Sequence, residues 1–245
     1  MQTSKQDITV NAIVVNDYRT ADVFKRHGIN YCCGNDISLI NACRENNIDI
    51  AVIEKELEQA TRTITLSNKL KLENWRVDFL IDYIINVHHD FIKETLPSLQ
   101  ATLLSFVAEH QQDFPELKQL VPVFQELAAV TMKQIQYEEE VFFPYIKQIE
   151  GMHRRREVYG GLFVKTLRKP LYSVVDSEHK EISCLMERIR AVTNNYIFPA
   201  GACTRHQVLF HMLKELDNDL IQHKHLENNI LFPKAMAIEK ELLQL

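Results

Sequence analysis

The sequence contains little glycine, little proline and no long apolar run. Only 6 glycines and 7 prolines occur among the 245 residues, which disfavours an architecture built from strands and tight turns. No apolar run approaches the length of a membrane span. The first twenty residues carry acidic side chains and lack the apolar core of a signal peptide. These absences predict a cytoplasmic protein that has no membrane partner.

A strong net charge and a regular cysteine pattern are also missing. The net charge is −5 with both signs mixed along the chain, so nothing indicates nucleic-acid binding. The 5 cysteines form an odd, irregular set without a C-x-x-C pair, which is atypical of secreted disulfide frameworks and of zinc motifs. Hydrophobic residues make up 46% of the chain, enough for a sizeable core.

Helical patterns fill the chain. Capping residues predict short helices over 19–27, 37–45 and 50–59, while residues 9–15 form either a helix or a strand. Four longer segments with apolar residues at helical spacing follow, over 75–110, 115–148, 170–194 and 204–240. Pro97 predicts a kink or break in the first of them, and the third could begin earlier, near Leu162.

These segments predict an all-α protein with two domains. Residues 61–75 are polar and uncapped, so we expect a linker between a small helical domain at 1–65 and a second domain at 72–245. The second domain fits an up-down four-helix bundle, in which residues 151–161 form a connecting loop.

One stretch occurs twice, near the ends of the second and fourth long helices. The copies read QIQYEEEVFFP over 134–144 and HKHLENNILFP over 223–233. In each, a carboxylate (Glu138 or Glu227) stands six residues before a proline and four residues after Gln134 or His223. Positions four apart share a helix face, so both carboxylates and His223 are predicted to point into the bundle. Gln134 stands where the repeat predicts histidine.

The other long helices offer further histidines. His179 lies on the apolar face of the third helix, and either His88 or His89 faces inward from the first. Imidazole and carboxylate ligands suit iron, manganese or zinc, and two carboxylates favour two bridged metals over one tetrahedral zinc. A buried carboxylate without a metal or partner would be costly. The alternative is a hydrogen-bonded His/Glu network without metal.

Cys32 and Cys33 form a second candidate site. Adjacent cysteines do not easily form a relaxed disulfide with each other, but as thiolates they can bind metal, nitric oxide or a second thiol. They lie between a helix C-terminus and the next helix N-terminus, and the latter favours a thiolate. The alternative is a pair of small residues buried in a tight turn.

These motifs together resemble the iron–sulfur cluster repair di-iron proteins. The segment DYRTADVFKRHGINYCCGN is similar to their short cysteine-pair domain. VHHDFIKETLP, EEEVFFP, SEH and HKHLENNILFP are similar to their hemerythrin-like domain, and GACTRH, with Cys203, to the loop before its last helix. The resemblance spans nearly the whole chain. It implies a cytoplasmic protein with a hemerythrin-like bundle, two non-heme iron ions and a role in repairing clusters damaged by nitric oxide or oxidative stress.

The resemblance also implies roles for individual residues. The family's metal ligands fall on His89, Glu138, His179, His223 and Glu227. Its remaining ligand histidine falls on Gln134, whose amide oxygen is a weak iron ligand, so one iron is expected to bind weakly. Glu178 matches an acidic residue beside the site that is suited to handling protons.

The function implied is donation of iron to damaged iron–sulfur proteins, which is not primarily an enzymatic reaction. Cys32 and Cys33 would assist the transfer, or bind nitric oxide or a thiol. The alternatives are a module that binds or senses O₂ or nitric oxide, a nitric oxide reductase, and a degenerate bundle with an incomplete metal site. A homodimer is compatible with each of them.

Overall fold

The computed structural model describes residues 8–31, 37–62, 71–110, 112, 114–167 and 171–244. Within these ranges the secondary structure is helical, and a single isolated bridge, between Thr9 and Ser38, is the only extended pairing. The predicted all-α class is therefore confirmed. The chain divides into two compact units, Met1–Asn68 with Tyr196–Lys214, and Lys69–Asn195 with Glu215–Leu245.

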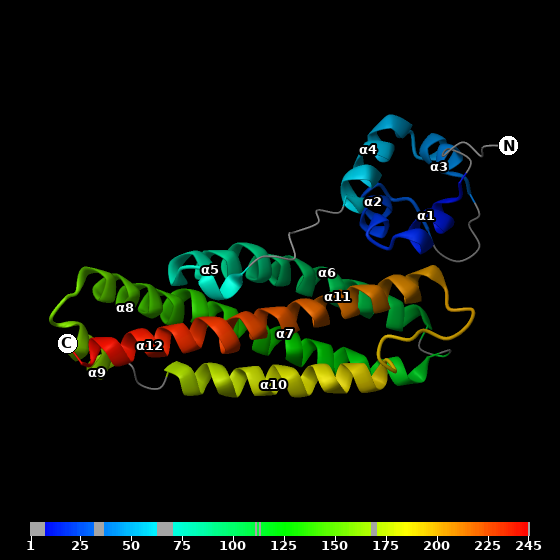
Figure 1. Ribbon diagram of the computed structural model, residues 1–245. Helices are drawn as coiled ribbons and strands as arrows, with labels where there is room; N and C mark the ends of the chain where they lie inside the picture. Colours follow the sequence, from blue (N-terminus) through cyan, green and yellow to red (C-terminus); the bar gives the residue numbers. More distant parts are fainter. Residues whose placement is uncertain are drawn as a thin grey trace. The chain divides into compact units, whose positions relative to one another are not determined.

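The first unit contains four short helices (Figure 1), α1 (Val10–Asn16), α2 (Thr20–Arg26), α3 (Leu39–Glu45) and α4 (Ile50–Thr61). Residues 9–15 are thus essentially helical. Asp49 caps α4 as predicted, because its side chain accepts a hydrogen bond of 2.9 Å from the Ala51 N–H. Gly28 follows α2 with φ +68°, a conformation that glycine adopts without strain. Cys32 and Cys33, and residues 63–70 of the predicted linker, lie outside the described residues.

The second unit contains the predicted bundle (Figure 1). Its first long segment consists of α5 (Val77–Tyr83), η3 (Ile84–His89) and α6 (Asp90–His110). The second consists of η4 (Pro115–Gln119), α7 (Leu120–Tyr137), η5 (Glu138–Phe142) and α8 (Phe143–Arg155). The third is α10 (Leu171–Val192), and the fourth consists of α11 (Thr204–Leu226), η6 (Glu227–Leu231) and α12 (Phe232–Leu242). The part of α11 up to Lys214 is assigned to the first unit. Two short elements, η2 (Leu72–Asn74) and α9 (Gly160–Leu167), complete the list.

Contacts between these elements define the bundle. Helices α6 and α10 pack against α7, while α5 and α12 pack against α8. Each repeat copy contains an apolar triplet, residues 141–143 or 230–232, and these triplets meet in the core, where the rings of Phe142 and Phe232 lie 5.1 Å apart at 69°. This packing holds the ends of the second and fourth segments together, and each segment carries its carboxylate three residues before the triplet.

The structure corrects two predictions about the helices. Of the kink or break predicted at Pro97, the break does not occur: helix α6 continues through this residue, because Ile92, Leu96, Leu99 and Leu103 bury one continuous stripe around it. Each such side chain contributes about 1.5–3 kcal/mol on burial, which offsets the roughly 3 kcal/mol cost of an interior proline. Helix α8 extends into the predicted loop 151–161, since Ile149 and Gly151 keep its inner face buried. It ends where Arg156 adopts φ 54°.

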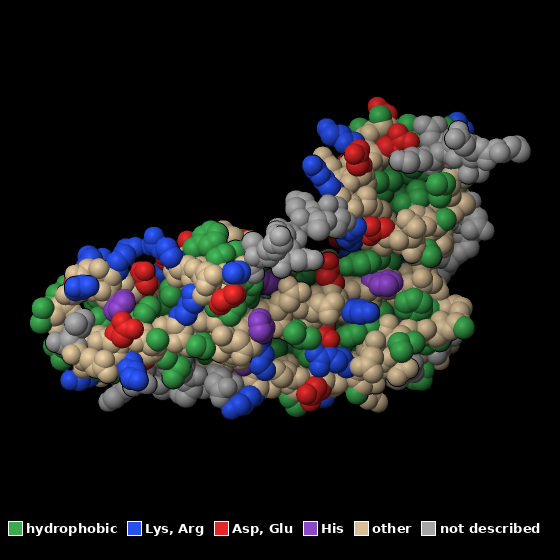
Figure 2. Space-filling model, in the orientation of Figure 1, with side chains coloured by type: hydrophobic (Ala, Val, Ile, Leu, Met, Phe, Trp, Pro, Cys, Tyr) green, Lys and Arg blue, Asp and Glu red, His purple; other side chains and the backbone are tan. Residues whose placement is uncertain are grey.

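The surface shows no strong preference for one charge sign. In the view of Figure 2, basic and acidic side chains are interspersed over the bundle. No helix in the described part of the chain is long and apolar enough to cross a membrane.

Candidate metal centre

Three of the four long segments change from α-helical to π-helical hydrogen bonding beside a predicted ligand. In each, one N–H donates to the carbonyl five residues earlier: Asp90 to Ile85, Phe143 to Glu138, and Phe232 to Glu227. Short π segments are frequent at functional sites because they re-aim side chains without ending the helix. Pro144 and Pro233 come directly after two of these bonds. Since proline has no N–H, it makes no α-helical bond to the residue four earlier, and the change of register takes place at these positions.

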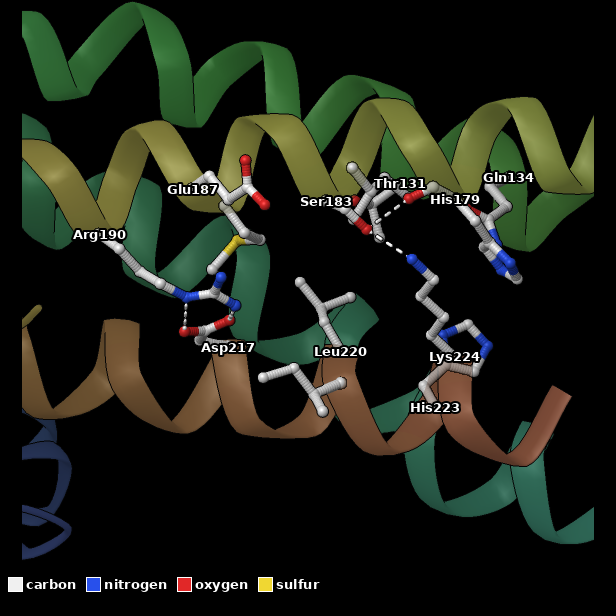
Figure 3. Close-up of a pocket in the computed structure, with 13 residues that line it drawn as sticks. Thr131, Gln134, His179, Ser183, Glu187, Arg190, Asp217, Leu220, His223 and Lys224 are labelled. Carbon is white, nitrogen blue, oxygen red and sulfur yellow. Dashed lines mark hydrogen bonds and ion pairs between the residues drawn. The ribbon is translucent and has the colours of Figure 1, made fainter. Parts of the chain in front are cut away.

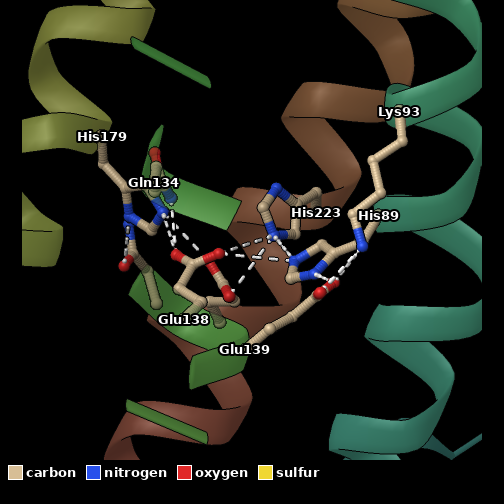
Figure 4. Close-up of polar contacts among 9 residues, drawn as sticks. His89, Lys93, Gln134, Glu138, Glu139, His179 and His223 are labelled. Carbon is tan, nitrogen blue, oxygen red and sulfur yellow. Dashed lines mark hydrogen bonds and ion pairs between the residues drawn. The ribbon is translucent and has the colours of Figure 1, made fainter. Parts of the chain in front are cut away.

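Four of the predicted ligands form one compact cluster (Figure 4). His89, Glu138, His223 and Glu227 each offer one ligand atom, and these atoms all lie within 4.8 Å of one another. His89 Nε2 is 3.4 Å from Glu138 Oε2, and His223 Nε2 is 3.3 Å from Glu227 Oε1. The two Nε2 atoms are 3.1 Å apart. All four side chains are buried.

The remaining two predicted positions adjoin this cluster. His179 Nε2 lies 2.9 Å from Glu227 Oε2 and 3.8 Å from Glu138 Oε1. Gln134 Nε2 donates a 2.6 Å hydrogen bond to Glu138 Oε1. The fold therefore brings all six positions together. Figure 4 labels five of them: His89, Gln134, Glu138, His179 and His223.

Several atoms of the centre make no hydrogen bond with any described residue. These atoms are Glu138 Oε2, both Glu227 carboxylate oxygens, His179 Nε2 and Gln134 Oε1. His89 Nδ1 lies 2.8 Å from Glu139 Oε1, and His179 Nδ1 lies 3.1 Å from Asn228 Oδ1. A proton on each Nδ1 leaves the Nε2 lone pair facing the carboxylates. Lone pairs and buried carboxylates that face one another are costly without a cation between them, so the donor set fits a metal.

The two buried carboxylates differ in proton affinity. Burial and the neighbouring Glu227 charge raise the pKa of Glu138 to about 8. Burial also raises the pKa of Glu227, but the charge of His223 and the approach of His179 outweigh it and lower this pKa below its usual range. Burial lowers the pKa of His89, which favours its neutral, metal-binding form. A cation entering this centre would therefore displace the proton of Glu138.

An outer contact that the sequence pattern missed supports His89. The Glu139 carboxylate bonds His89 Nδ1 and accepts hydrogen bonds of 2.6 and 2.8 Å from Lys93 Nζ. Glu140 is the exposed member of the acidic run. Such carboxylate contacts orient a ligand imidazole and raise its basicity. Lys93 follows His89 by four residues, which is the signal that the sequence offered for this contact.

Three other side chains close to predicted ligands in the sequence lie outside the cluster. His88 is buried but bonds Asp219 Oδ1 through Nδ1 at 2.8 Å, so His89 is the member of the pair that reaches the carboxylates. His225 is exposed. Glu178, which precedes His179 in the sequence, is buried and accepts a 3.0 Å hydrogen bond from Lys133 Nζ.

Comparison with known proteins agrees with this geometry. Residues 6–61 match a domain of unknown function (DUF542), and residues 80–235 match the hemerythrin HHE cation binding domain. The iron–sulfur cluster repair protein YtfE of Escherichia coli O81 (strain ED1a) is 33% identical over 241 residues, which cover 96% of this chain and 99% of that protein. The protein of the same name from Citrobacter koseri is 32% identical over 243 residues. The matched region covers 96% of this chain and 100% of that protein. The matched domain and the buried His/Glu cluster together indicate metal binding.

Proposed function

The chain belongs to the family of the iron–sulfur cluster repair proteins, and we propose that it repairs clusters damaged by nitric oxide or oxidative stress by donating iron. The observation that carries this proposal is the match to repair proteins over 96% of the chain, together with a buried His/Glu cluster inside the cation binding domain. Damaged iron–sulfur proteins are then the partners, and iron is the cargo.

Six side chains would hold two iron ions. We assign His89 and His223 to one position and His179 with Gln134 to the other, with Glu138 and Glu227 between them. The first position has two imidazole donors, whereas the second has one imidazole and one amide oxygen. Because amide oxygen is the weaker donor, the second ion is held less tightly and is the one donated. Bound iron supplies the atom that a damaged cluster has lost.

The protein's own groups compensate part of the charge when the centre is emptied of cargo. Once no ion is bound, Glu138 takes up one proton, because its pKa in the metal-free centre is about 8. Glu227 stays ionised beside His223 and His179, which are 3.3 and 2.9 Å away. Lys93 and Glu139 keep the His89 ring oriented, so that the centre is ready for another ion.

The cysteine pair belongs to the same proposal. We assign Cys32 and Cys33 to the domain at 1–65, where they assist iron transfer or bind nitric oxide or a thiol, and we assign the iron centre to the domain at 72–245. Glu178, adjacent in sequence to His179, is assigned to proton handling beside the centre. Replacement of both cysteines by serine should lower cluster repair while leaving iron per chain unchanged.

The decisive measurement is iron per chain after anaerobic reconstitution, combined with reactivation of a nitric-oxide-damaged iron–sulfur enzyme. Glu227→Gln should lower both, while Glu140→Gln, an exposed neighbour of the centre, should change neither. Stoichiometric iron without reactivation would contradict the repair proposal. A reversible oxygenated absorption band that is independent of Cys32 and Cys33 would indicate a gas-binding module instead, and nitrous oxide formed under turnover would indicate a reductase.

A further inference from the structure

An open pocket of about 390 Å³ lies between α7, α10 and α11 and reaches the metal centre (Figure 3). Gln134, His179 and His223 form its inner end. The side chains of Ile182, Met186 and Leu220 form an apolar part of its wall. The pocket therefore joins the weaker of the two proposed metal positions to solvent through a passage whose wall carries apolar side chains beside polar and charged ones.

Lys224 brings a positive charge into this pocket, where the carboxylate of Glu187 also lines the wall but forms no ion pair with it. Its Nζ donates a 2.7 Å hydrogen bond to Ser183 Oγ, and it forms no ion pair with a described residue. Other cations nearby are paired: Arg190 bonds Asp217 at 2.7 and 2.5 Å, and Lys133 bonds Glu178. Figure 3 shows the Lys224 side chain extending from α11 across the pocket toward Ser183 on α10. The ammonium group has further donors to offer an anion.

Thr131 adds an unused hydroxyl to the same space. Its side chain is 1% exposed, and its Oγ1 makes no hydrogen bond with the described residues. It lines the pocket one helical turn before Gln134. A buried hydroxyl without a partner costs about 1–3 kcal/mol, a cost that a ligand oxygen in the pocket would remove.

We propose that this pocket binds a small organic carboxylate. The carboxylate group faces Lys224 and the Thr131 hydroxyl, and the carbon chain lies against Ile182, Met186 and Leu220. The apolar wall is the reason for an organic anion rather than an inorganic one, because an inorganic oxyanion would leave this surface in contact with water.

One consequence rests on the proposed function. Two divalent ions carry four positive charges, and Glu138 with Glu227 supplies two negative charges, so the loaded centre has excess positive charge. A carboxylate held by Lys224 stands at the end of the pocket where Gln134 replaces an imidazole donor. It would supply negative charge, and a further oxygen donor, on the side of the centre that has one imidazole instead of two.

Calorimetric titration of the full chain with butyrate, before and after iron loading, tests the site. We expect saturable binding of one butyrate per chain, with affinity about tenfold lower in Lys224→Met and several-fold lower in Thr131→Val. Lys133→Met serves as the matched control, since Lys133 is exposed and paired with Glu178, and it should bind butyrate like the wild type. Absence of saturable binding, or equal affinity in Lys224→Met with its helical content intact, overturns the inference.

Titrations with inorganic phosphate and acetate separate the contributions of charge and apolar wall. Both should bind more weakly than butyrate, and equal affinity for phosphate would overturn the assignment of an organic ligand. The outcomes also separate this site from the repair proposal. Wild-type protein that holds iron but binds no butyrate contradicts only the carboxylate site. Protein that binds butyrate through Lys224 but neither holds nor donates iron contradicts only the proposed function.

Discussion

Gln134 donates a hydrogen bond of 2.6 Å from Nε2 to Glu138 Oε1, one helical turn along the same segment. In the other copy of the repeat, His223 stands at the equivalent spacing with its Nε2 3.3 Å from Glu227 Oε1. Both pairs are buried. One copy thus offers an amide that occupies its carboxylate, while the other offers an imidazole. This chemical difference is the source of the asymmetry that we propose between the two metal positions.

Replacing Gln134 with histidine should raise metal content. Gln134→His supplies a nitrogen donor and removes the amide that occupies Glu138 Oε1, so iron per chain after reconstitution should rise and its loss to a chelator should slow. Gln136→His is the matched control, because Gln136 lies on the exposed face of α7 and bonds Glu140. Unchanged iron in Gln134→His would show that Gln134 does not limit occupancy.

Neutralising Glu139 should weaken metal binding without unfolding the protein. Glu139→Gln removes the charge that orients His89 and balances Lys93, and loss of such outer contacts typically costs 10–100-fold in metal affinity. Competition with a coloured chelator measures this change. Glu140→Gln, one residue further on and exposed, should retain wild-type affinity. A Glu139→Gln protein with unaltered affinity would rule out the orienting role.

The stability of the metal-free protein should fall as the pH rises toward 8. The pKa of Glu138 is raised to about 8 from an ordinary value of 4.5, so the folded state binds a proton that the unfolded state releases. This stabilisation is complete below pH 4.5 and is lost as the pH rises through about 8. Glu138→Gln mimics the protonated form and lacks this dependence.

Urea unfolding of both proteins between pH 5.5 and 9 tests this prediction. The wild type should lose free energy of unfolding relative to Glu138→Gln as the pH rises. A constant difference between the two would contradict the raised pKa. Saturation with metal should remove the effect, because the cation replaces the proton.

Truncating Phe142 should destabilise the bundle strongly. Phe142 is fully buried against Phe143 and Phe232, so Phe142→Ala should lower the free energy of unfolding by about 3–5 kcal/mol. Its neighbour Val141 is 44% exposed, and Val141→Ala should change stability by about 0.5 kcal/mol or less. Thermal and chemical unfolding measure both. If both variants lost similar free energy of unfolding, the assignment of Phe142 to the core and of Val141 to the surface would be contradicted.

Much of the bundle was predictable because its signals are local. Apolar spacing defines the long helices, and the repeated carboxylate-to-proline spacing indicates that Glu138 and Glu227 face inward. The inward direction of His179 follows from its apolar neighbours in the same way. By contrast, helical spacing left His88 and His89 undecided, because each has apolar neighbours one turn away. Both are in fact buried, and only contacts with other helices, Asp219 for His88 and Glu139 for His89, distinguish them.

The all-α class, a bundle with six candidate positions on four helices, and the replacement of an expected histidine by Gln134 are all readable from the amino-acid order. How these positions meet depends on the packing of the helices: the π segments, the contact of Lys93 and Glu139 with His89, and the hydrogen bond from the Gln134 amide to Glu138. The tertiary structure also places Lys224 in the pocket beside the centre, where it bonds Ser183 and forms no ion pair within the described part of the chain. Periodicity reports which face of a helix is buried. The partner of a buried polar atom depends on the distances between helices, which no single segment specifies.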